Sequence, residues 1–81
     1  GRIHYDGGDY KDAVEDYSAV VKLDASRAVA FSSRGLLYMY LSEWDKSIAD
    51  YTAAIKLDPG VAVLHSNRGN VYRESGRQET E

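Results

Sequence analysis

The stretch Arg34-Gly35-Leu36-Leu37-Tyr38 recurs 34 residues later as Arg68-Gly69-Asn70-Val71-Tyr72, so the chain carries an internal repeat. A second stretch recurs in the same register: Asp16-Tyr17-x-Ala19-x-x-Lys22-Leu23-Asp24 returns as Asp50-Tyr51-x-Ala53-x-x-Lys56-Leu57-Asp58. A fixed period of this length predicts stacked supersecondary units, each of which buries its apolar face against its neighbours.

Within each repeat, apolar residues fall at three- and four-residue steps, which is the spacing of one face of an α-helix. The expected helices span residues 9–22, 26–41, 43–56 and 60–74, and a short helical stub precedes them. No strand-like alternation is present in the sequence. The predicted fold class is therefore all-α.

Typical capping residues flank these helices. We expect Asp9 to cap the first helix, Ser42 and Asp45 to form a capping box, and Asp58 to cap the last helix with Pro59 as its first residue. Glycine-containing pairs mark the helix ends, with Gly7-Gly8 closing the stub and Ser75-Gly76 closing the last helix.

Two glycines stand well inside the expected helices, although glycine costs about 1 kcal/mol relative to alanine there. Gly35 and Gly69 occupy corresponding places in the repeat. We expect each to allow the close approach of a neighbouring helix, with Ala13 or Ser47 as the small residue opposite.

Length and composition exclude several classes of protein. The 81 residues make one small domain, and 43% hydrophobic with 28% charged residues indicate a folded protein. The net charge is −3 and the ten basic residues are scattered, so we expect no nucleic-acid partner. There is no cysteine, which excludes disulfides and thiolate metal sites. No apolar run approaches the ~20 residues that span a bilayer, so we expect no membrane partner.

The spacing Phe31-x-x-Arg34-Gly35-x-x-Tyr38, then Ser47-x-x-x-Tyr51, then Pro59 resembles the tetratricopeptide repeat signature. The resemblance implies antiparallel helical hairpins stacked as a short right-handed α-solenoid. It implies about two and a half repeats, truncated at both ends. Residues 1–24 form a partial repeat lacking most of its first helix, 25–58 a complete repeat, 59–76 the first helix of a third repeat, and 77–81 a tail. Two departures concern charge, because Arg34 and Arg68 stand where the family usually has leucine.

The resemblance also implies a function, that of a non-catalytic scaffold that binds a peptide or protein partner in a concave groove. The chain is then a fragment of a longer repeat array. In this family the first helix of each repeat lines the groove, and the corresponding residues here are Tyr5, Val29, Ser32, Leu36, Met39, Tyr40, Val63, Ser66, Asn70, Arg73 and Glu74. The alternative for Leu36 and Met39 is a place in the intramolecular core.

A second function is self-association through the open repeat ends. We expect the helix that would cover Tyr10, Ala13 and Tyr17 to be mostly missing, and we expect no following helix to bury His65, Gly69 and Tyr72. Docking one end on the other would rebuild a repeat and give a homo-oligomer.

No catalytic, metal or cofactor site is expected. His4 and His65 stand where the family has packed aromatics, so we expect structural roles for both. A metal site at His4, Asp6 and Asp9 is an alternative, but the Gly7-Gly8 turn explains these residues more simply. Five acidic residues are expected on the solvated convex face: Asp12, Glu15, Asp16, Asp45 and Asp50.

Overall fold

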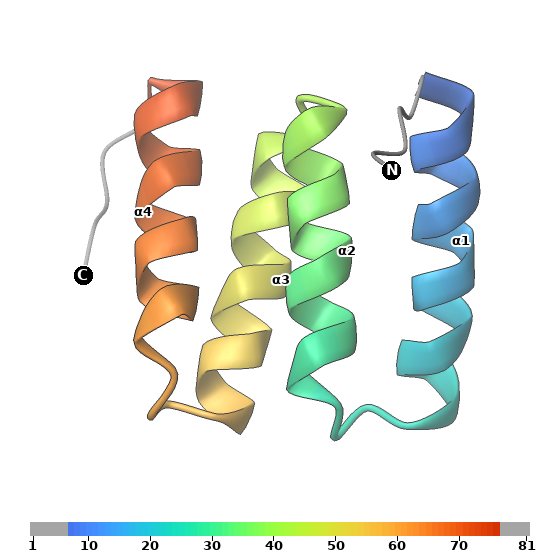
Figure 1. Ribbon diagram of the computed structural model, residues 1–81, viewed down its shortest axis with the longest axis horizontal. Helices are drawn as coiled ribbons and strands as arrows, with labels where there is room; N and C mark the ends of the chain where they lie inside the picture. Colours follow the sequence, from blue (N-terminus) through green and yellow to red (C-terminus); the bar gives the residue numbers. More distant parts are fainter. Residues whose placement is uncertain (1–6, 77–81) are drawn as a thin grey trace, which may run out of the picture.

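The computed structural model describes residues 7–76, which form four helices, each antiparallel to the one before it (Figure 1). They are α1 (Gly7–Leu23), α2 (Ala28–Tyr40), α3 (Trp44–Leu57) and α4 (Ala62–Ser75). There is no strand in this part of the chain, which confirms the all-α prediction.

The helices pack in sequence order. α1 packs on α2, α2 on α3 and α3 on α4, and a smaller contact joins α2 with α4. Among these four helices, α1 contacts neither α3 nor α4. In Figure 1, α1 and α4 accordingly lie at opposite edges, with α2 and α3 between them. Packing between nearest neighbours is the arrangement of a helical repeat stack, as the 34-residue period predicts.

The buried cluster lies where α3 meets α2 and α4. Its central members are Tyr51 and Ala54 of α3 with Leu64 and Val71 of α4. Half-buried apolar side chains surround them: Ala28, Phe31, Met39, Trp44, Ile48, Ile55 and Val61. None of the side chains described in α1 is fully buried. The core is therefore centred on α3.

An ion pair joins α2 to α3. Arg34 donates from Nε and Nη2 to the two carboxylate oxygens of Asp50, each at 2.7 Å, and from Nη1 to Ser18 Oγ of α1 at 3.1 Å. The hydrogen bonds that Arg34 donates to Asp50 raise the pKa of Arg34 above its ordinary value. The guanidinium also lies over the rings of Phe31 and Tyr38. One side chain thus connects three helices.

This ion pair corrects the prediction that Asp50 lies on the solvated face, because its side chain is only 6% exposed. Arg34 brings a cation into a contact where the family usually has leucine, and a buried cation requires a paired anion. The other four acidic residues, Asp12, Glu15, Asp16 and Asp45, are exposed as expected.

Gly35 lies against α3, as predicted. A Cβ on Gly35 would lie 3.1 Å from Tyr51 Cε2 and 3.3 Å from Asp50 Cβ, and Ser47 Oγ donates a 2.6 Å hydrogen bond to the Gly35 carbonyl. The expected contact with Ser47 is confirmed. Gly69 differs, since a Cβ there would meet nothing within 4 Å.

Two predicted helix starts are wrong. Gly7 and Gly8 are helical residues of α1 and do not form the predicted turn, and Asp9 lies within this helix instead of capping it. The predicted stub lies outside the described residues. α4 begins at Ala62 with Val61 as its N-cap, so Pro59 lies in the linker. Proline disfavours helical backbone in the residue before it, and Asp58 is accordingly extended, with φ −144° and ψ 79°.

The predicted capping box at Ser42 is also wrong. Glu43, not Ser42, is the N-cap of α3, and no side chain caps it. Ser42 instead helps to end α2. The Glu43 N–H donates to the Tyr38 carbonyl and the Ser42 N–H to the Met39 carbonyl, while Ser42 takes a left-handed φ of 61°. This is a Schellman motif. At the end of α4, the predicted stop is confirmed, since Gly76 has a φ of 75°.

Candidate partner-binding groove

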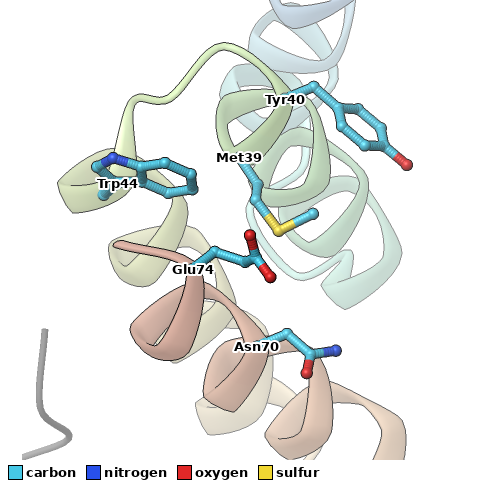
Figure 2. A pocket seen from close by; sticks show the side chains of 5 residues that line it. All are labelled: Met39, Tyr40, Trp44, Asn70 and Glu74. Carbon is cyan, nitrogen blue, oxygen red and sulfur yellow. The ribbon is translucent and has the colours of Figure 1, made fainter. Parts of the chain in front are cut away.

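A cavity of about 540 Å³ opens between the last turns of α2 and α4 and the first turn of α3. Its lining residues are Met39, Tyr40, Trp44, Asn70 and Glu74 (Figure 2). The three that come from α2 and α3 are apolar or aromatic, whereas the two from α4 are polar. The cavity therefore has one apolar wall and one polar wall.

The repeat explains why these residues meet. α2 and α4 run in the same direction, so their last turns lie at the same end of the molecule (Figure 1). The tight Schellman turn then places the first residue of α3, Trp44, close to the end of α2. Figure 2 shows the Glu74 carboxylate beside the Met39 side chain, with Trp44 on the same side of Met39 and Tyr40 on the other side, pointing away.

Tyr40 is held from α1. Its ring stacks on that of Tyr10, with centroids 5.2 Å apart and planes 28° from parallel. Tyr40 nevertheless keeps 53% of its surface exposed. Stacking fixes the ring without covering it, so an incoming side chain meets an aromatic surface that is already ordered.

Met39 has a double role. It is half-buried and packs against the core cluster, and it also lines the cavity. Leu36, one turn earlier on α2, is 37% exposed. Met39 therefore belongs both to the groove and to the intramolecular core, whereas Leu36 lies at the surface.

On the α4 side, polar groups are fixed beside the cavity. Arg73 Nη2 donates a hydrogen bond to Asn70 Oδ1. This leaves the Asn70 amide nitrogen as a donor and the exposed Glu74 carboxylate as an acceptor and negative charge. The chemistry of the cavity suits binding of an apolar group next to hydrogen-bond donors or a positive charge.

The remaining predicted groove residues lie outside the cavity. Val29, Val63, Ser66 and Arg73 are exposed, and Ser32 is half-buried with its hydroxyl donating to the Val29 carbonyl. Tyr5 lies outside the described residues. Of the predicted set, the structure brings Met39, Tyr40, Asn70 and Glu74 together. Trp44 was missed because its spacing on α3 matches that of a core residue.

The residues predicted for self-association lie on two helices, α1 and α4. Tyr10 stacks on Tyr40, as described, whereas Ala13 and Tyr17 of α1 are half-buried. On α4, Gly69 and Tyr72 are half-buried and His65 is exposed. The expected packed role for His65 is therefore wrong, because its side chain is exposed. His4 is outside the described residues.

The same repeat appears in comparison with protein families. A family model described as TPR repeat matches residues 1–42 and again residues 35–76. The chain belongs to the tetratricopeptide repeat family. Tetratricopeptide repeats generally mediate protein–protein interaction, and the family typically consists of non-catalytic scaffolds. Comparison with curated proteins gave no match.

Two further structural findings concern membranes and metal ions. None of the four described helices has the length and apolar character that a membrane span requires. Between residues 7 and 76, no three histidine or carboxylate side chains gather where they could hold a metal ion.

Proposed function

We propose that this chain is a non-catalytic interaction module that binds a peptide or protein segment in the groove at Met39, Tyr40 and Trp44. The observation that carries the proposal is the ordered but exposed Tyr40 ring beside the cavity. An aromatic side chain that is held in place and half uncovered loses little conformational entropy on binding, which is typical of binding hot spots.

The cavity also suggests what the bound segment contains. Its apolar wall fits one apolar or aromatic side chain, and Met39 is flexible enough to adapt to its shape. Its polar wall presents a carboxylate at Glu74. We therefore propose a segment with an apolar anchor next to a lysine or arginine.

Selection from a displayed library of random peptides tests the proposal. The enriched peptides should pair an apolar or aromatic residue with a basic one. Tyr40→Ala should weaken binding of a selected peptide by about tenfold or more, because it removes half of the aromatic wall. Glu74→Lys should weaken basic peptides and spare neutral ones.

The matched control is Leu23→Ala, which truncates an exposed side chain of α1 that does not line the cavity. Circular dichroism confirms that each variant keeps its helices. Peptides that bind the Tyr40→Ala and Glu74→Lys variants as tightly as the parent would show that the partner surface lies elsewhere.

A further inference from the structure

We propose that the chain associates head to tail, with α4 of one copy docking on α1 of the next in the register of its own α2–α3 contact. This surface is separate from the groove, and the inference stands without the groove proposal. One helix contact inside the molecule serves as the template for the contact between molecules.

The template is the contact of α2 with α3. Three interactions define it: the Arg34–Asp50 ion pair, the close approach of Gly35 to the Tyr51 ring, and the hydrogen bond from Ser47 to the Gly35 carbonyl. In this contact Ser47, Asp50 and Tyr51 are all buried.

α4 carries the same docking residues as α2, shifted by one repeat. Arg68, Gly69 and Tyr72 correspond to Arg34, Gly35 and Tyr38. The arginines are also oriented alike. Arg68 Nη1 donates to Thr52 Oγ1 at 3.1 Å, as Arg34 Nη1 does to Ser18 Oγ, and Thr52 and Ser18 are themselves one repeat apart. Around Gly69, however, the space that Tyr51 fills beside Gly35 is open.

α1 carries the same docking residues as α3. Ala13, Asp16 and Tyr17 correspond to Ser47, Asp50 and Tyr51. Asp16 is exposed, and Ala13 and Tyr17 are half-buried, whereas their counterparts on α3 are fully buried beneath α2. The set of side chains that contacts a helix on α3 is thus present on α1, where Asp16 is exposed and the other two are only partly covered.

The two faces are complementary in charge and in shape. In the template register, Arg68 of one copy meets Asp16 of the next, and the Tyr17 ring fills the space beside Gly69. Ala13 is as small as Ser47 but has no hydroxyl. The contact between copies therefore lacks the hydrogen bond that Ser47 donates to the Gly35 carbonyl in the template. A head-to-tail contact must either close into a ring or continue as a filament.

Exchanging the charges at Arg68 and Asp16 tests whether these two residues meet in the contact between copies. Sedimentation of the 81-residue chain from the low micromolar to the low millimolar range should show association. Arg68→Asp and Asp16→Arg should each weaken it by roughly tenfold or more, because each places like charges together. An equimolar mixture of the two variants should associate again, since every contact between unlike copies then pairs opposite charges. The double variant should also associate.

A second variant probes shape. Gly69→Leu should leave the monomer folded, because the space beside Gly69 is open, yet it should abolish association by filling the place of Tyr17. Ser66→Leu adds similar bulk at an exposed position of α4 and should leave association unchanged. Circular dichroism verifies folding of all variants.

Three results would overturn the proposal. A chain that stays monomeric throughout would show that copies do not dock on one another. A closed dimer that is insensitive to Asp16→Arg would indicate two-fold pairing of like ends. Failure of the mixed charge variants to associate, with both variants folded, would exclude the Arg68–Asp16 register.

Discussion

Arg34 shows how one residue changes the chemistry of a helix contact. The family usually places leucine here, but arginine in this chain connects α1, α2 and α3 through Ser18 and Asp50. The sequence predicted the glycine beside it and the contact of that glycine with Ser47. It did not predict burial of Asp50, because an acidic residue at this helical spacing is equally compatible with a solvated face until its partner is known.

Substitutions of Arg34 and Asp50 should have strongly non-additive effects on the free energy of unfolding. Asp50→Ala leaves the Arg34 guanidinium without its carboxylate partner between helices and should lower the free energy of unfolding by about 3 kcal/mol. Arg34→Leu should also be costly, since it leaves the Asp50 carboxylate buried without its cation. The double variant should cost less than the sum of the two by at least about 1 kcal/mol, as measured by urea denaturation. Strictly additive costs would contradict the ion pair.

The two repeat glycines should respond oppositely to the same substitution. Gly35→Leu forces a side chain against the buried Tyr51 ring and should cost more than about 2 kcal/mol. Gly69→Leu has open space and should gain up to about 1 kcal/mol from helix propensity. Both values come from urea denaturation at low micromolar protein. A Gly35→Leu variant as stable as the parent would remove the packing explanation for this glycine.

Tyr51 should make the protein sensitive to alkaline pH. Burial, followed by the nearby Tyr40 and Asp50 charges, raises the pKa of Tyr51 from 10.0 to about 12. Between these values the unfolded chain has lost a proton that the folded chain keeps, so unfolding becomes more favourable as pH rises. The free energy of unfolding should fall by about 2 kcal/mol across this window. Tyr51→Phe should remove this decrease in the free energy of unfolding. If the variant showed the same pH profile as the parent, the raised pKa of Tyr51 would not be its cause.

At the scale of the elements, the helical period predicted where helices lie but not how they begin. Apolar spacing located all four described helices, because each must bury one face. The starts depended on capping residues, which are ambiguous in sequence. Ser42 followed by Asp45 reads as a capping box, yet the short connection uses Ser42 to end α2. In the groove, Met39, Tyr40, Asn70 and Glu74 followed from helix register, whereas the place of Trp44 depends on this turn.

The turn offers its own test. Ser42 has a left-handed φ of 61°, a conformation that glycine adopts without steric cost. Ser42→Gly should therefore raise the free energy of unfolding by about 0.5–1 kcal/mol in thermal or urea denaturation. The matched control is Ser33→Gly inside α2, where the same change should lower stability. If Ser42→Gly were destabilising to the same extent as Ser33→Gly, the Schellman geometry at this turn would be wrong.

At the scale of the whole molecule, stability should grow by addition of helices. Because each of the four described helices packs mainly on its neighbours, a further helix can be added at an end of the stack without rearranging the rest. The outer faces of α1 and α4 then carry the same kinds of residues that contact a neighbouring helix within the stack. Covering one of them with a helix of known register should both stabilise the chain and block its association.

A designed extension makes this prediction concrete. Replacing residues 77–81 with a second copy of residues 43–58 places a new helix after α4 at the offset that α3 has from α2. The copied Asp50 then meets Arg68, and the copied Tyr51 fills the space beside Gly69. Burial of that ring alone should raise the free energy of unfolding by roughly 2 kcal/mol. The same extension with lysine in place of the copied Asp50 and Tyr51 should gain little. If the first extension neither raised the melting temperature nor abolished association, the α2–α3 contact would not transfer to α4.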